Sequence, residues 1–231
     1  GKSVLKAVLP SPLLGVYLNP DEIEASIRQN GCLDLGAFGV STTAAELLPA
    51  FMGSELLRSA GLLEPARRLR LEGGRLEFDG VRVNAYFASV VADVLRQDLL
   101  VRRASFTCET VMSHPGKVAL LEQAQRLGYR TYLYFVATDD PEINVSRVRN
   151  RVGLGGHPVP EDKIISRYYR SLALLLEAIK RTSRAYIFDN STDSSDPQLA
   201  WIAEITDGRQ LELKSDRIPA WFKRAVIEKI A

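Results

Sequence analysis

The chain begins with Gly1, Lys2 and Ser3, three residues whose types could together bind a phosphate group. They match the last three positions of the pattern G-x-x-x-x-G-K-[ST], which forms a phosphate-binding loop between a strand and a helix. In such a loop Lys2 would contact the β- and γ-phosphates, and the Ser3 hydroxyl would bind Mg²⁺. The tripeptide alone is a weak signal, because it also arises by chance or from an expression tag. A genuine match implies that further residues, including a central strand, precede Gly1 in the natural protein.

Asp21 and Glu22 follow a short apolar strand predicted at about 13–19 and a proline, so we expect both carboxylates at the edge of a sheet. A phosphotransferase needs a carboxylate near the hydroxyl that receives the phosphoryl group. Asp21 is the first candidate for that carboxylate and Glu22 is the alternative. Both acids could instead only complement the positive N-terminus of the helix predicted at 20–30.

Glu109, Thr110 and Ser113 follow a second strand, predicted at about 104–108. A carboxylate just beyond a strand end could bind acceptor hydroxyls or a water on Mg²⁺. The alternative is that these residues form a simple turn.

Three arginines, Arg147, Arg149 and Arg151, lie on a helix that precedes the glycine-rich loop "GLGGHPVP". Arg147 and Arg151 are four residues apart and therefore share a helix face. Their charges repel each other unless an anion or an acid lies nearby. A triphosphate could accept bidentate hydrogen bonds from both guanidinium groups. A solvated basic face is the alternative. His157 in the loop could donate a hydrogen bond as a neutral imidazole.

Asp189 and Asn190 end the last strand of the predicted core, "AYIFDNS". Such residues could bind a ligand, because ligands lie at the carboxyl ends of parallel strands. They could equally form an Asx turn, in which an Asp or Asn side chain accepts a backbone N–H two residues further on.

Strands alternate with helices from about 104 to 190, which predicts right-handed crossovers and an α/β fold with a mostly parallel sheet. Four polar segments end its strands and should converge on one crevice. They are residues 19–22, 109–113, 138–140 and 189–191. The segment at about 31–80 contains a Gly-Gly hairpin signal and is interpreted as an insertion in one domain of residues 1–231. A hairpin at 202–214 and a helix at 219–230 are predicted to close the chain.

The composition indicates an ordinary globular protein with a formal net charge of +2. That charge gives no strong field for nucleic acid or for a membrane surface. Two cysteines, Cys32 and Cys108, are too few for a disulfide framework, and we find neither a secretion signal nor an apolar run of membrane-spanning length. We therefore expect a cytoplasmic protein with neither a nucleic-acid nor a membrane partner.

Several segments occur in one order that resembles the zeta-toxin family and its predicted-ATPase relatives, which are P-loop kinases. They are "YLNPDEI", "FTCETVMS", "GYRTYLYFV", "RVRNRVGLGGHPVPEDKIISRYYRSL" and "YIFDNS". The resemblance covers most of residues 1–25 and 85–195. The stretch from the Gly-Gly-His segment to Arg-Tyr-x-Arg-Ser-Leu is its most specific part, whereas 31–80 resembles nothing general. The resemblance implies a P-loop NTPase fold, a three-layer αβα arrangement like that of nucleoside kinases.

The resemblance also implies roles for individual residues. Gly1, Lys2 and Ser3 would end a Walker A loop that binds ATP, with Ser3 as a ligand of Mg²⁺. Asp21 would be the catalytic base, and Arg147 and Arg151 would stabilise the transferred phosphoryl group. The nucleotide would further contact the loop at His157 and the strand end at Asp189 and Asn190. The acceptor would contact a set of polar side chains, namely Asp21, Glu22, Glu109, Thr110 and Ser113.

The implied activity is transfer of the γ-phosphoryl group of ATP to a hydroxyl of a nucleotide-sugar such as UDP-N-acetylglucosamine. A protein antitoxin is a possible partner. Family members with a Thr two residues after the substrate-binding Glu have Val111 at that position here, which puts one hydrogen bond to the acceptor in doubt. The alternatives are a kinase for another small molecule and a regulatory ATP-binding module without transfer activity.

Overall fold

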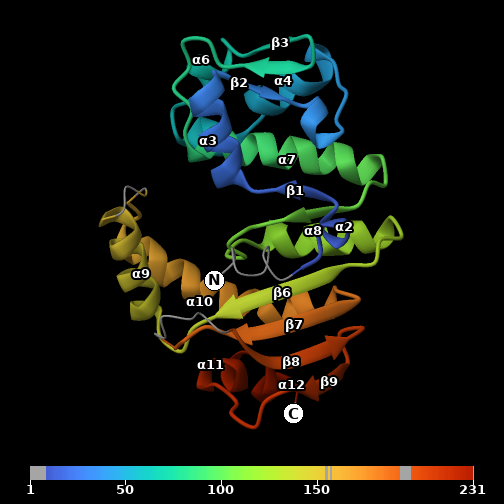
Figure 1. Cartoon of the computed structure of the whole chain (residues 1–231), viewed down its shortest axis with the longest axis vertical. Helices are drawn as coiled ribbons and strands as arrows, with labels where there is room; N and C mark the ends of the chain where they lie inside the picture. The colour runs from blue at the N-terminus through green and yellow to red at the C-terminus, as the bar shows by residue number, and fades with distance from the viewer. Residues whose placement is uncertain (1–8, 154–155, 157, 193–198, 231) are drawn as a thin grey trace. The chain divides into compact units, whose positions relative to one another are not determined.

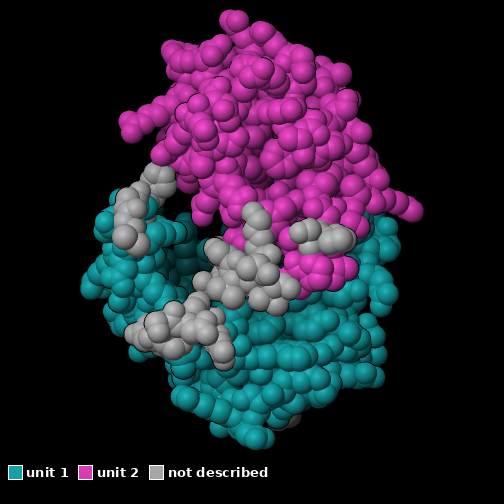
Figure 2. All heavy atoms as spheres, viewed as in Figure 1, with its two compact units in different colours: residues 1–8, 111–231 teal, residues 9–110 magenta. Residues whose placement is uncertain are grey.

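The computed structural model forms two compact units, which Figure 2 colours separately. Unit 1 contains residues 1–8 and 111–231, and unit 2 contains residues 9–110. The structure describes most of the chain, namely residues 9–153, 156, 158–192 and 199–230. The prediction of one domain with an insertion stays a prediction, and each unit is described by itself below.

Unit 2 contains a two-stranded parallel sheet of β1 (Val16–Leu18) and β5 (Phe106–Cys108). The backbone pairing continues past β5, because the Glu109 N–H donates to the Leu18 carbonyl over 2.9 Å. Gly15 precedes β1 with a φ of +58°, and a Cβ at this position would clash with the backbone of the adjacent strand. Only glycine therefore allows the chain to enter β1 in this conformation.

A second sheet of unit 2 is antiparallel and has the order β2-β4-β3. Its strands are β2 (Cys32–Asp34), β3 (Arg70–Glu72) and β4 (Arg75–Glu77). Gly73 and Gly74 join β3 to β4 with φ values of +57° and +80°, the backbone that a tight two-residue hairpin requires. The predicted hairpin is confirmed, whereas β2 was not predicted.

Five helices of unit 2 contribute to one hydrophobic core. They are α3 (Pro20–Asn30), α4 (Ala44–Met52), α5 (Glu55–Ser59), α6 (Leu63–Ala66) and α7 (Ala85–Val101), whereas the short α2 (Ser11–Leu14) precedes β1. Ile27 of α3 and Phe87 of α7 belong to the same buried cluster as Phe51 and Leu76. The segment interpreted as an insertion is thus packed against the helices that flank it, through side chains that water does not reach.

Unit 1 contains a four-stranded sheet with the order β6-β7-β8-β9 (Figure 1). The strands are β6 (Tyr132–Ala137), β7 (Arg184–Asp189), β8 (Ala200–Thr206) and β9 (Gln210–Leu213). β6 and β7 are parallel, in a register that sets Ala137 opposite Asp189. β7, β8 and β9 follow one another in antiparallel pairs, the last of which is the predicted C-terminal hairpin.

The long helices of unit 1 are α8 (Pro115–Arg126), α9 (Pro141–Gly153) and α10 (Glu161–Lys180). Alternate residues of β7, Ala185 and Ile187, pack into one core with side chains of α10 such as Leu175 and Ile179. The predicted closing helix begins as α11 (Ala220–Phe222), widens into a π-helical turn (Lys223–Ile227) and ends as α12 (Glu228–Ile230). Trp221 and Phe222 bury it in the core of unit 1.

The chain is thus an α/β protein with mixed helices and sheets, as predicted. The parallel pairing expected for the core strands is present between β1 and β5 and between β6 and β7. The other four strand pairings that the structure describes are antiparallel, and one mostly parallel sheet stays a prediction. Two of these four pairings, β3 with β4 and β8 with β9, join strands connected by a short turn, and a turn of a few residues can join only antiparallel neighbours. The three-layer P-loop arrangement stays a prediction. Within the described ranges no helix combines the length and the apolar character needed to cross a bilayer.

Candidate functional site

A cluster of polar side chains lies at the carboxyl ends of β1 and β5 in unit 2, and we call it the carboxylate cluster. Its members are Tyr17, Asn19, Asp21, Glu22 and Glu109. The register sets Tyr17 opposite Thr107, and one further step of two residues along each chain sets Asn19 opposite Glu109. Since side chains two residues apart share a face of a strand, Tyr17, Asn19 and Glu109 project to the same side.

Asn19 connects the helix terminus with two of the acids. Its Oδ1 accepts the Asp21 N–H over 3.0 Å and caps α3. This bond turns the amide group so that Nδ2 donates to Glu109 Oε2 at 3.3 Å and to Glu22 Oε1 at 3.4 Å. One neutral side chain therefore donates hydrogen bonds to two carboxylates, which belong to segments about 90 residues apart in the sequence.

Tyr17 binds the other carboxylate oxygen of Glu109. Its hydroxyl donates to Glu109 Oε1, so that both carboxylate oxygens of Glu109 accept a hydrogen bond from β1 or its end. Burial raises the pKa of Tyr17 above its usual value, and the hydrogen bond and negative charge of Glu109 raise it further. The hydroxyl consequently stays protonated at physiological pH and stays a donor.

The acids of the carboxylate cluster differ in exposure. Asp21 and Glu22 are exposed in the first turn of α3, whereas Glu109 and the neighbouring Thr110 are half-buried. Ionised carboxylates only accept hydrogen bonds, so a ligand of this cluster has to donate them. Ser113, the fifth predicted acceptor contact, belongs to unit 1, and its N–H donates to the Val111 carbonyl.

A second group of polar residues, which we call the loop cluster, lies at the carboxyl ends of β6 and β7 in unit 1. Asp189 Oδ1 accepts the Ser191 N–H at 3.0 Å, and Oδ2 accepts the Ser191 hydroxyl at 2.8 Å and the Trp221 indole N–H at 2.7 Å. Asp189 is 9% exposed. The structure therefore has the Asx turn that the sequence left as an alternative, and both oxygens of Asp189 are bonded within the protein.

Hydrogen bonds also fix the chain around this turn. The Ser191 hydroxyl accepts the Asp139 N–H at 2.7 Å, and the Tyr168 hydroxyl donates to the Thr138 carbonyl at 2.8 Å. Burial, followed by nearby charges, raises the pKa of Tyr168 to about 12. The Asn190 N–H donates to a carbonyl of β6, while its buried Oδ1 accepts no hydrogen bond from the residues that the structure describes.

The three arginines of α9 have different surroundings. Arg149 forms an exposed ion pair with Glu161 at 2.6 Å. Arg147 is half-buried and donates a long hydrogen bond of 3.4 Å to the Thr192 carbonyl. Arg151 is exposed, and its carbonyl accepts the Gly156 N–H at 2.9 Å. Arg147 and Arg151 lie one turn apart on α9, as expected from their spacing.

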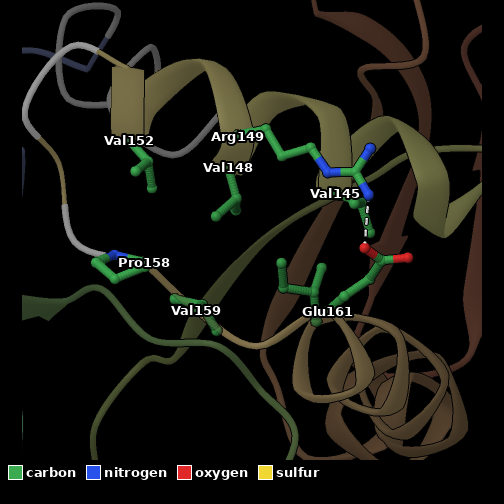
Figure 3. Close-up of a pocket in the computed structure, with 8 residues that line it drawn as sticks. Val145, Val148, Arg149, Val152, Pro158, Val159 and Glu161 are labelled. Carbon is green, nitrogen blue, oxygen red and sulfur yellow. Dashed lines mark hydrogen bonds and ion pairs between the residues drawn. The ribbon is translucent and has the colours of Figure 1, made fainter.

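A pocket of about 270 Å³ lies between α9 and the beginning of α10 (Figure 3). Apart from Arg149 and Glu161, its walls are apolar: Val145, Val148, Val152, Pro158, Val159 and Ile164. The two charged side chains face each other and neutralise each other. This pocket therefore lacks the excess positive charge that a triphosphate needs.

The structure brings together some of the predicted site residues. Residues 19–22 meet Glu109, and residues 138–140 meet residues 189–191. The convergence of all four segments on one crevice stays a prediction. Gly1, Lys2, Ser3 and His157 lie outside the described residues. Within the described ranges, no three His, Cys, Asp or Glu side chains are grouped so that they could hold a metal ion.

Sequence reasoning missed Tyr17 and Trp221 as members of these clusters, and it placed Asn19 among the polar residues at a strand end without giving it a role. An Asn directly before Pro-Asp-Glu is an N-cap signal that could have drawn attention to Asn19. The spacing of Tyr17 and Asn19 by two residues indicates one strand face. No local pattern predicts the bond of Trp221, because its partner Asp189 is 32 residues away.

Comparisons with known proteins identify no family for this chain. No family model matches the chain. Likewise, no curated protein and no solved structure matches it.

Proposed function

We propose that this protein is an ATP-dependent small-molecule kinase of the zeta-toxin type, which phosphorylates a hydroxyl of a nucleotide-sugar such as UDP-N-acetylglucosamine. The observation that carries the proposal is the meeting of Asp21, Glu22 and Glu109 around Asn19 at the ends of two parallel strands. Carboxylates at that position suit an acceptor with hydroxyl donors. The roles of ATP, Mg²⁺ and the nucleotide-sugar acceptor rest on the resemblance of the sequence segments to the zeta-toxin family.

In the proposed reaction the acceptor oxygen attacks the γ-phosphorus of ATP, and the bond from that phosphorus to the β-bridging oxygen breaks. ADP leaves, and the acceptor hydroxyl gives its proton to Asp21. Glu109 and Glu22 orient the acceptor by accepting hydrogen bonds from it. Lys2, Arg147 and Arg151 neutralise charge on the phosphates. Bound Mg²⁺ would contribute further neutralisation, with Ser3 as its expected protein ligand.

ADP release by the full-length protein tests this proposal directly. We expect release from ATP and Mg²⁺ to depend on UDP-N-acetylglucosamine, and the product to carry one additional phosphate by mass spectrometry. Release without any acceptor, or ATP binding without release, would favour a regulatory ATP-binding module. The absence of both binding and release would refute the kinase.

Lys2→Ala tests the phosphate-binding loop separately. We expect this variant to bind ATP more weakly in calorimetry, because it lacks the cation that contacts the β- and γ-phosphates. Lys223→Ala, which removes a lysine from the C-terminal helix, is the control and should bind ATP like the wild type. Equal affinities of Lys2→Ala and the wild type would remove Gly1-Lys2-Ser3 from the proposed site.

A further inference from the structure

Both carboxylate oxygens of Glu109 accept hydrogen bonds within the carboxylate cluster. Tyr17 donates to Oε1, and Asn19 donates to Oε2 over 3.3 Å. The backbone pairing of Glu109 with Leu18 fixes its Cα beside β1 as well. A carboxylate with both oxygens bonded cannot rotate about its terminal torsion without losing a hydrogen bond.

Asn19 combines two roles that a substitution can separate. Its Oδ1 caps α3, a role that Ser or Asp can also fill at an N-cap position. Its Nδ2 donates to Glu109 and Glu22, a role that neither Ser nor Asp can fill in this geometry. An Asp at this position would keep the cap but would place a third negative charge between two carboxylates.

We propose that Tyr17 and Asn19 are positioning residues, which orient the Glu109 carboxylate for the hydroxyl of the phosphoryl acceptor. This inference rests on the proposed kinase function. Each oxygen of an ionised carboxylate has a second lone pair, so Glu109 can still accept a hydrogen bond from the acceptor on each side. Tyr17 and Asn19 would contact the acceptor only through Glu109. Their loss should therefore affect the use of the acceptor and leave the use of ATP unchanged.

The test measures acceptor-dependent ADP release of the full-length protein and separates kcat from KM for each substrate. We expect Tyr17→Phe and Asn19→Ser each to lower kcat/KM for the acceptor by about 10- to 150-fold, the range that corresponds to losing a hydrogen bond to a charged group. Asn19→Asp should lower it further. The KM for ATP should stay at the wild-type value in all three variants.

Two control variants separate positioning from stability. Tyr86→Phe removes the hydroxyl of an exposed tyrosine in the first turn of α7. Asn84→Ser changes an N-cap that accepts two backbone N–H groups but binds no carboxylate in the described hydrogen bonds. Both controls should keep wild-type kinetics. If Asn84→Ser lowered kcat/KM as much as Asn19→Ser, the effect would be one of helix capping and the inference would be wrong.

A double-variant cycle with Glu109→Gln sharpens the test. If Tyr17 acts through Glu109, adding Tyr17→Phe to Glu109→Gln should lower kcat/KM no further. Independent, multiplying effects of the two substitutions would overturn the inference, as would wild-type kinetics of Tyr17→Phe and Asn19→Ser. A wild-type protein without acceptor-dependent ADP release would instead refute the kinase itself. The two failures are therefore distinguishable.

Discussion

The carboxylate cluster of unit 2 and the loop cluster of unit 1 start from the same sequence pattern, a short apolar strand followed by acidic and amide residues. In the carboxylate cluster neutral donors hold the acids, and Asp21 and Glu22 stay exposed. In the loop cluster Ser191 and the Trp221 indole surround Asp189, which is buried. Both oxygens of Glu109 and both oxygens of Asp189 accept hydrogen bonds within the protein, so burial makes the difference: Glu109 is half-buried, whereas Asp189 is buried.

The comparison predicts that substitutions in the carboxylate cluster change activity, whereas those in the loop cluster change stability. The largest effect is expected for Asp21→Asn, which removes the proposed proton acceptor. We expect acceptor-dependent ADP release to fall by about 10²- to 10⁴-fold, the usual contribution of general-base catalysis. Asp162→Asn, an exposed Asp at the same second position of α10, is the control and should keep full activity. Full activity of Asp21→Asn would exclude it as the base.

Asp189→Asn should lower the stability of the fold, in contrast to Asp21→Asn, which should lower the activity. It places an amide beside the Trp221 indole N–H, so that one buried donor or acceptor loses its partner. We expect the free energy of unfolding to fall by about 1–3 kcal/mol in chemical denaturation. Asp207→Asn, at an exposed turn residue with a φ of +50°, should be close to neutral, since Asn tolerates this conformation. An unchanged free energy of unfolding in Asp189→Asn would contradict the stabilising role of the loop cluster.

Tyr168→Phe removes the hydroxyl that donates to the Thr138 carbonyl in the loop cluster. At neutral pH we expect a loss of about 0.5–1.5 kcal/mol in the free energy of unfolding. The neighbouring Tyr169 is 59% exposed, and Tyr169→Phe is the control that should change little. Equal unfolding midpoints of the two variants would show that the Tyr168 hydrogen bond contributes nothing measurable.

The last prediction concerns alkaline pH. Burial raises the pKa of Tyr168 to about 12, above the value of about 10 expected in the unfolded chain. Above pH 10 the unfolded state therefore loses a proton that the folded state keeps, and the stability of the fold declines as pH rises from about 10 to about 12. Unfolding midpoints measured across this range should decline less steeply in Tyr168→Phe than in the wild type. Parallel declines would contradict the assignment.

Much of the local structure was determined by the sequence itself. The Asn19 cap before Pro20 predicts where α3 begins, and the double glycine at 73–74 predicts a hairpin. Both depend on backbone preferences within a few residues, which do not need the rest of the fold. The helical spacing of apolar residues likewise predicted the long helix α7, and short apolar runs predicted the strands β6 and β7.

Only the tertiary structure decided which acids are available. The sequence placed Glu109 and Asp189 alike, each at the end of an apolar strand. The partners that distinguish them are distant in the chain: Tyr17 for Glu109, and Trp221 for Asp189. Since hydrogen bonds between distant residues depend on how strands pair and how helices pack, no local pattern contains them. The sequence could therefore propose both Glu109 and Asp189 as site residues. Only the fold leaves the carboxylate cluster accessible and encloses Asp189.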